Sequence, residues 1–313
     1  MSKPVQANQH GYIRYLLYIG IICLLVVLLV RQRATIVQAA QSATHANTGW
    51  LVLGIVAMFA TLPASTLVYK VLSPKPLRFG RTLLVQMAGF CVNKLLPSGS
   101  GAAGTSFLYL RANKVSTVQA GAVVLLNNIL GLLGHVLLFL FFILFEPSAL
   151  GSLDIASNTV TTGIQILSVV GLLAAGLAIL LRSKLANFVQ PLKSLLTHPR
   201  DLLKALSASM LITLSYAVSL FASAAAVGVH LSLATAIIAL SASVLATSIV
   251  PTPGGVGAAE AGAYTGLVAM GVNNDMALAT ALLYRVCTFW IPLIIGSGAF
   301  ILVVKRGYLK ARA

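Results

Sequence analysis

The residues best suited to chemistry are polar side chains beside two interruptions of otherwise apolar sequence. Asn93 and Lys94 precede "PSGSGAA" (97–103), and Glu260 follows "PGGVGAA" (253–259). Both interruptions have the pattern P-x-G-x-G-A-A. Glycine and proline break helices, and exposed backbone groups at membrane depth are tolerated only inside protein or beside a water-filled cavity. Matched interruptions in two halves of a chain are typical of a transporter's binding site.

Arg285 is a partner for the acid that follows the second interruption. A tight turn around Asn274 joins the last two apolar segments, and Glu260 and Arg285 lie about 14 and about 11 residues from it, which at ~1.5 Å per residue gives similar depths on antiparallel helices. A charge in hydrocarbon costs about 2.5–3.5 kcal/mol, so charges there are normally paired or face a cavity. We expect a Glu260–Arg285 pair, which either holds two helices together or also binds a phosphate.

These observations define a set of candidate substrate-binding residues. They are Asn93, Lys94, Pro97, Gly99, Gly101, Pro253, Gly254, Gly255, Gly257, Glu260 and Arg285. We expect the paired glycines Gly254 and Gly255 to let the backbone turn sharply and expose its polar groups to a cavity. The alternative is that the small residues only let helices pack closely and that the repeated pattern arose by chance in a chain rich in alanine and glycine.

The elements that position these residues are membrane-spanning helices. The chain is 58% hydrophobic and 8% charged, which excludes a single water-soluble core with a polar surface. Apolar segments near or above the ~20 residues that cross a bilayer predict an all-α polytopic protein with about eight spans. The expected spans are Tyr12–Val30, Trp50–Val71, Val118–Phe145, Thr159–Leu181, Ala205–Val229, Leu231–Val250, Ala258–Met270 and Met276–Val304.

The two interruptions predict two broken hairpins within one membrane domain, 1–313. The first, at 82–114, belongs to a half at about 12–145, and the second, at 231–270, belongs to a half at about 159–304. If residues 81–114 enter and leave on one side, the first hairpin opens toward the cytoplasm and the second toward the outside. Such opposed hairpins are what an inverted repeat would produce.

The distribution of Lys and Arg predicts the orientation. With the N-terminus in the cytoplasm, every Lys and Arg lies on the cytoplasmic side except Arg31, Arg33, Lys94 and Arg285. The loop at 146–158 has two acids and no base, as expected of an outer loop. The formal charge of +16 is therefore read as attraction to anionic lipid of the cytoplasmic leaflet rather than to nucleic acid. We expect a cell membrane protein with both termini in the cytoplasm.

Neither a metal nor a cofactor is expected. Cys23, Cys91 and Cys287 lie far apart within apolar segments, which favours small buried hydrophobes over a disulfide or metal framework. His135, alone in an apolar span, is better explained as an interhelical hydrogen-bond partner than as a ligand. No phosphate-binding lysine loop is present, so ATP is not the expected energy source.

The chain resembles the flippase-like domain also called the lysylphosphatidylglycerol synthase transmembrane region. The resemblance is carried by "NKLLPSGSGAAGTSFLYLRANKVS" in the first half, and by "SIVPTPGGVGAAEAG" and "ALLYRVCTFWIPLIIG" in the second. It covers most of 86–296. By this similarity Asn93 and Pro97 match in the first half, and the second-half motif positions are Pro253, Gly254, Gly255, Gly257, Glu260 and Arg285.

Two departures from the family pattern limit what the resemblance implies. Many relatives have a Glu and an Arg shortly after the first proline, and residues 101–105 have neither, so the first half is expected to bind lipid differently or only to pack. The chain ends at Ala313, which leaves no room for the soluble aminoacyltransferase domain of two-domain relatives. Lipid synthesis is therefore not expected.

The sequence therefore predicts a flippase-like transporter and not an enzyme. Its partner would be a membrane lipid, either an anionic phospholipid or a lipid-linked precursor. The alternative is a non-transporting scaffold or accessory subunit that presents lipid to a separate synthase or glycosyltransferase. An intramembrane hydrolase is the weakest reading, because no Ser/His or paired-carboxylate set has a suitable spacing.

The predicted orientation can be tested with reporter fusions. A reporter fused after Ala149 should be outside the cytoplasm, and one fused at Arg200 should be inside, because only this arrangement places nearly all basic residues in the cytoplasm. A cytoplasmic signal at Ala149 would show that the 81–114 hairpin is wrongly assigned, and the opposed-hairpin interpretation would fail with it.

Overall fold

The described part of the chain is helical. The computed structural model describes residues 46–96, 100–146 and 199–310, together with Arg33, Val37 and Thr44. Two expected spans, Tyr12–Val30 and Thr159–Leu181, lie outside the described residues, as do Pro97 and Gly99. The helices are α3 (Thr48–Leu72), α4 (Phe79–Leu95), α5 (Ser100–Ala112), α6 (Thr117–Phe145), α10 (Pro199–Ala226), α11 (Leu233–Ile249), α12 (Ala258–Ala269), α13 (Asn274–Arg285), the π-helical turn η1 (Val286–Trp290) and α14 (Ile291–Lys305).

Four of these elements are long and apolar enough to cross a bilayer. They are α3, α6 and α10, with 25, 29 and 28 residues, and the continuous helix from α13 through η1 to α14, with 32 residues. Much of α6 faces outward with apolar side chains, including Leu144 and Phe145, each 75% exposed. A surface of this kind is compatible with lipid and not with water. The predicted all-α polytopic membrane fold is confirmed.

The remaining helices form two hairpins that are too short to cross. Helices α4 and α5 have 17 and 13 residues, and α11 and α12 have 17 and 12. At 1.5 Å per residue these lengths are about 18–26 Å, below the ~30 Å hydrocarbon thickness. The segments Leu231–Val250 and Ala258–Met270 are therefore the two arms of one broken hairpin and not complete spans.

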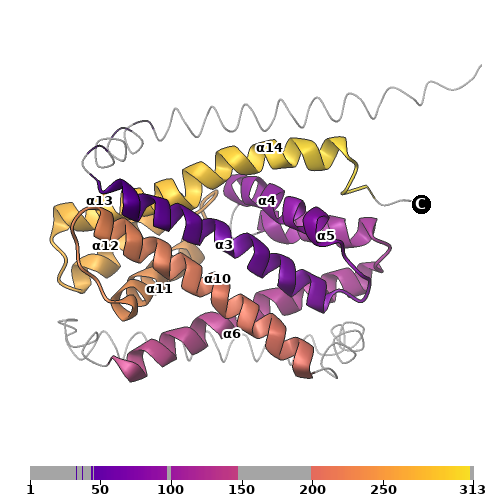
Figure 1. Ribbon diagram of the computed structural model, residues 1–313, viewed down its shortest axis with the longest axis horizontal. Coiled ribbons are helices and arrows are strands. Elements are labelled where there is room, and N and C mark those ends of the chain that lie inside the picture. Colours follow the sequence, from indigo (N-terminus) through magenta and orange to yellow (C-terminus); the bar gives the residue numbers. More distant parts are fainter. Residues whose placement is uncertain are drawn as a thin grey trace, which may run out of the picture.

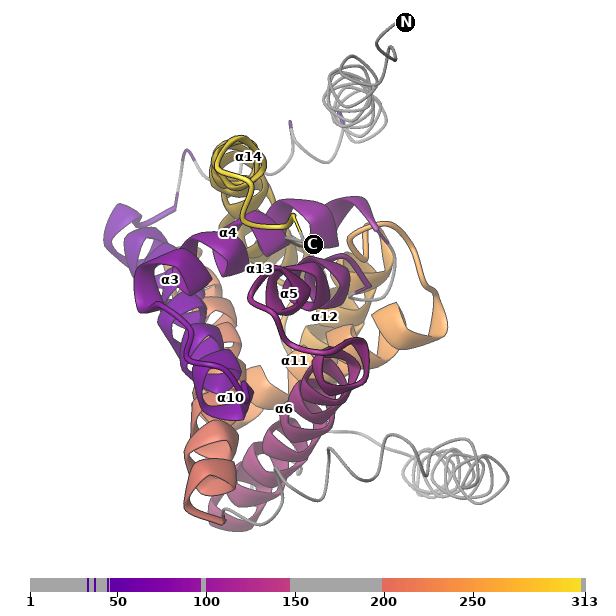
Figure 2. The same ribbon diagram turned by 90° about the vertical axis from the view of Figure 1, so that its right-hand side faces the viewer.

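The hairpins open toward opposite ends of α3. The backbone N–H of Asn47, at the start of α3, donates to the carbonyl of Ala226 at the end of α10, 2.8 Å away. The α11–α12 hairpin follows that end of α10, whereas the α4–α5 hairpin follows the other end of α3. In the end view of Figure 2 both hairpins lie between α14 above and α6 below, with α3 and α10 along one side. The opposed directions are those an inverted repeat requires, while the limits of its two halves stay a prediction.

In each hairpin a glycine of one arm packs directly against the backbone of the other arm. In the first hairpin a Cβ on Gly101 would clash with the backbone at Val92 of α4. In the second, a Cβ on Gly262 would lie 2.7 Å from the carbonyl oxygen of Ala242. In Figure 1, α14 runs along α4 and so covers one side of the first hairpin. Small residues thus bring the arms together, as expected of helices packed in a membrane.

The fold makes a prediction about Gly101 with a control on the same helix. Gly101→Ala should destabilise the protein by about 1–3 kcal/mol, because the arms of the first hairpin must separate. Gly104→Ala should be neutral or stabilising by up to about 1 kcal/mol, because nothing lies within 4 Å of that position and alanine favours helix. Thermal unfolding in detergent measures both. Equal effects of the two changes would exclude the close contact.

Candidate functional site

The tips of the two hairpins contact each other. The N–H of Gly254, in the second tip, donates to the carbonyl of Leu96 in the first, at 3.4 Å. A Cβ on Gly254 would lie 2.6 Å from the carbonyl oxygen of Lys94 and 2.5 Å from the ring of Phe289. Only glycine allows this approach. The two interruptions of the sequence therefore meet in space, near the ends of half-length helices.

Glycines shape the second tip as predicted. Gly254, Gly255 and Gly257 have φ angles of +60°, +69° and +82°, a region that side chains other than glycine occupy at a cost. The hydroxyl of Thr252 donates to the carbonyl of Val256 at 2.8 Å, and this hydrogen bond spans the turn. The sharp turn expected at Gly254–Gly255 is thus present.

Glu260 and Arg285 form the expected ion pair. The Nε of Arg285 donates to Oε1 of Glu260 at 2.8 Å, and the side chains are 6% and 16% exposed. Oε2 of Glu260 accepts from the N–H of Gly257 at 2.8 Å, which caps the start of α12. Nη2 of Arg285 donates to the carbonyl of Gly254 at 3.1 Å. The pair therefore binds α13 to the second tip and satisfies two backbone groups of the interruption.

A π-helical turn follows Arg285 directly. In η1 the N–H of Ile291 donates to the carbonyl of Val286, five residues earlier. Pro292 lies at the start of α14 and has no N–H to continue the regular pattern. The turn positions Phe289, whose ring centre lies 4.4 Å from the guanidinium carbon of Arg285. Such turns are frequent at functional sites, and Pro292 was the sequence signal for it.

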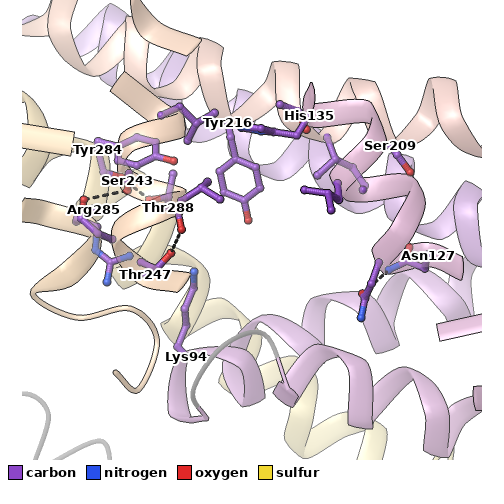
Figure 3. A pocket seen from close by; sticks show the side chains of 18 residues that line it. Lys94, Asn127, His135, Ser209, Tyr216, Ser243, Thr247, Tyr284, Arg285 and Thr288 are labelled. Carbon is purple, nitrogen blue, oxygen red and sulfur yellow. Dashed lines mark hydrogen bonds between the residues drawn. The ribbon is translucent and has the colours of Figure 1, made fainter. Parts of the chain in front are cut away.

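A cavity of about 480 Å³ opens beside the tips. Its polar lining comes from residues of five helices and η1: Lys94, Asn127, Asn128, His135, Ser209, Thr213, Tyr216, Ser243, Thr247, Tyr284, Arg285 and Thr288. Figure 3 shows Lys94 and Arg285 on one side of the space and Asn127 on the other, with the Tyr216 hydroxyl pointing inward. The ring of His135 also makes the predicted interhelical contact, 3.0 Å from the Ser241 hydroxyl.

A second cavity, of about 250 Å³, lies against the tips themselves. Its lining includes Asn93, Leu96, Gly254 and Gly255, and it shares Thr247, Ala259 and Arg285 with the large cavity. Arg285 therefore borders both spaces, and the contacting tip residues Leu96 and Gly254 line the smaller one.

Lys94 is a buried cation without an acidic partner. It is 8% exposed, and no carboxylate in the described ranges lies within salt-bridge distance of it. Its nearest aromatic partner is Phe289, with 5.5 Å between Nζ and the ring centre. Lys94 and Arg285 thus place two basic side chains at the cavity against the one carboxylate of Glu260. Each tip joins one helix C-terminus to one helix N-terminus, so the helix dipoles largely offset each other.

The structure divides the remaining sequence candidates into two groups. Asn93, Gly254 and Gly255 line the smaller cavity, and the Asn93 side chain also accepts a 3.4 Å hydrogen bond from the N–H of Ala102. Gly101, Pro253 and Gly257 line neither cavity; Gly101 packs against α4, and Gly257 caps α12. Within the described ranges, no three metal-ligating side chains cluster.

Sequence reasoning missed the wall of the large cavity formed by α6 and α10. Asn127 and Asn128 interrupt the apolar sequence "VVLLNNILGLL", which was an available signal. Tyr216 and Thr213 gave none, because which face of α10 turns inward depends on the packing of its neighbours.

Comparison with known families identifies a matching family model. The family model described as "Lysylphosphatidylglycerol synthase TM region" matches residues 15–296. A comparison with curated proteins found no match.

The Glu260–Arg285 pair predicts a measurable coupling. Glu260→Gln and Arg285→Gln should each lower the unfolding temperature, since breaking a buried pair typically costs about 3–5 kcal/mol. Arg285→Gln should cost more, because it also leaves the Gly254 carbonyl without its donor. The double variant should recover part of the loss, measured by thermal unfolding.

The matched control is the exposed pair Lys204–Asp201, whose side chains are 67% and 47% exposed. Lys204→Gln should change stability by less than about 1 kcal/mol. Additive effects of the Glu260 and Arg285 changes, within the ~0.3–0.5 kcal/mol of independent sites, would contradict the pairing.

Proposed function

Because the chain belongs to the family of the lysylphosphatidylglycerol synthase transmembrane region, we propose that it moves a phospholipid or lipid-linked precursor between membrane leaflets. The family and the four apolar spans make it a membrane protein of lipid metabolism or transport. We further propose that it acts as a flippase in the cell membrane, with both termini in the cytoplasm.

The observation that carries the proposal is the excess of basic over acidic side chains at the central cavity. Lys94 and Arg285 are both buried there, and Glu260 offsets only one of them. An unpaired buried cation costs about 2.5–3.5 kcal/mol, and a phosphate would remove that cost through charge-assisted hydrogen bonds. Hydroxyl and amide groups of α6 and α10 on the opposite wall suit the rest of a polar headgroup.

The joined tips supply a physical route. A flippase must give the headgroup a polar path while the acyl chains stay in lipid. The hydrogen bond between the tips is long, 3.4 Å from Gly254 N to Leu96 O, and is weaker than an ideal one. Separation of the tips would join the two cavities around Arg285, which borders both. In this mechanism the protein makes and breaks no covalent bond and is not an enzyme.

The test is leaflet exchange of labelled lipids in reconstituted vesicles. Wild-type protein should exchange at least one phosphate-bearing lipid class, and Lys94→Gln should slow exchange about tenfold or more. Because Lys94→Gln removes an unpaired buried charge, the variant should be as stable as wild type or more so. Reduced transport with equal or higher stability separates a binding role from a structural one.

Lys75→Gln is the matched control, because Lys75 is exposed in the loop between α3 and α4. It should leave exchange unchanged. If wild-type protein binds lipid and exchanges none across a panel of headgroups, the chain is a lipid-presenting scaffold and the transport proposal fails.

A further inference from the structure

A third cavity, lined by basic residues, lies away from the central site. It has a volume of about 360 Å³ and is lined by Arg81, Tyr109, Ala112, Asn113, Lys114, Arg306, Gly307, Tyr308 and Lys310. Four of these residues are cations, and none is acidic. The lining comes from the start of α4, the end of α5 with its following turn, and the turn after α14. These three helix ends lie together near the C-terminal end in Figure 2.

The turns that build this cavity have defined geometry. After α14 the N–H of Tyr308 donates to the carbonyl of Val303 and the N–H of Gly307 to that of Val304, with φ +67° at Gly307. This is a Schellman turn, and it folds Arg306–Lys310 back toward α4. There Tyr308 lies over Arg81, with 5.4 Å between the ring centre and the guanidinium carbon.

Lys114 is strained at the corresponding position of α5. The N–H of Val115 donates to the carbonyl of Leu110 and the N–H of Lys114 to that of Arg111, which is the same turn. Helices α10, α12 and α14 end in this turn with Gly228, Gly271 and Gly307 in the left-handed region. At the end of α5 the residue is Lys114, with φ +62°, the one non-glycine residue of the described chain with positive φ.

A lysine in this conformation costs stability that glycine would not. Strained residues cluster at functional sites, and Lys114 lines the basic cavity. The charge cluster at the cavity points to an anionic ligand, and the chain has a lysine at this turn although glycine would fit the backbone without strain.

The depth of the cavity suits a lipid headgroup. Arg81 and Lys94 are 13 positions apart on α4, or ~20 Å along the helix. With the hairpin tips near mid-membrane, ~20 Å reaches the headgroup region of a bilayer ~40–45 Å thick. The helices that carry the cavity expose apolar side chains just below it. Leu302 lies one turn before Arg306, and Leu108 lies one turn before Ala112; they are 45% and 47% exposed.

We propose that the cavity between the ends of α4, α5 and α14 binds a phosphate group, with Lys114, Arg306, Lys310 and Arg81 as its ligands. Two sources could supply this phosphate. One is the headgroup of an anionic phospholipid in the leaflet that this face meets, and the other is free inorganic phosphate. The site does not depend on the proposed transport, and it lies at the opposite end of α4 from Lys94.

The experiment measures lipids retained by full-length protein after extraction from vesicles of phosphatidylcholine and phosphatidylglycerol, by native mass spectrometry. Wild-type protein should retain phosphatidylglycerol in preference to phosphatidylcholine. Lys114→Gly and Arg306→Gln should each reduce that retention about fivefold or more, because each removes a charge-assisted contact to the phosphate. Lys114→Gly should also unfold at the same temperature as wild type or higher, since it relieves the strained turn.

The matched control is Lys75→Gln/Arg78→Gln, which removes two exposed cations from the adjacent α3–α4 loop. Its retention of phosphatidylglycerol should stay close to that of wild type, because neither residue lines the cavity. An equal loss in this control would overturn the proposal, because general attraction to a basic face would then suffice.

Two further measurements identify the source and separate this proposal from transport. Displacement of retained phosphatidylglycerol by excess inorganic phosphate supports a site that takes free phosphate, and retention despite that excess supports a lipid site. If wild-type protein binds no inorganic phosphate and shows no lipid preference, both sources are refuted. Lys114→Gly should exchange lipid between leaflets at the wild-type rate, because Lys114 does not line the central cavity.

Discussion

The structure depends on how backbone groups are satisfied where two helices are broken inside the membrane. In hydrocarbon every unpaired N–H or carbonyl costs several kcal/mol, and each interruption creates such groups. Arg285 and Glu260 satisfy two of them, the carbonyl of Gly254 and the N–H of Gly257, while pairing with each other. The ion pair and the broken helix therefore stabilise each other, since each supplies what the other lacks.

The same constraint explains why the hairpin tips lie against each other. A tip that faced lipid would leave its backbone groups unsatisfied, whereas opposed tips can bond across the contact, as Gly254 does with Leu96. Glycine is required at the contact because the Lys94 backbone and the Phe289 ring leave no room for a side chain. Polar cavities beside the contact follow, because the hydroxyl and amide groups that surround the breaks cannot face lipid.

Much of this arrangement followed from sequence patterns that are local or linear. The long spans follow from the length of the apolar segments. The similar depth of Glu260 and Arg285 follows from the fixed rise per residue of the two helices on either side of the turn at Asn274. Helix rotation and tertiary contact decide the rest, which includes the inward face of α6 and α10 and the packing role of Gly101. The strained backbone of Lys114 also escaped prediction, since lysine at a helix end reads as an ordinary surface residue.

The π-helical turn η1 fixes the rotational phase of the last long helix. Upstream of η1, α13 directs Arg285 at the second hairpin tip, and downstream α14 packs along α4 of the first hairpin. The additional residue in that turn rotates one half of the helix against the other by about 100° relative to an uninterrupted helix. Loss of a single residue within Val286–Trp290 would therefore leave the helix continuous and apolar while turning one of its two contact faces away from its partner. In this span the chain can tolerate changes of side chain more readily than changes of length.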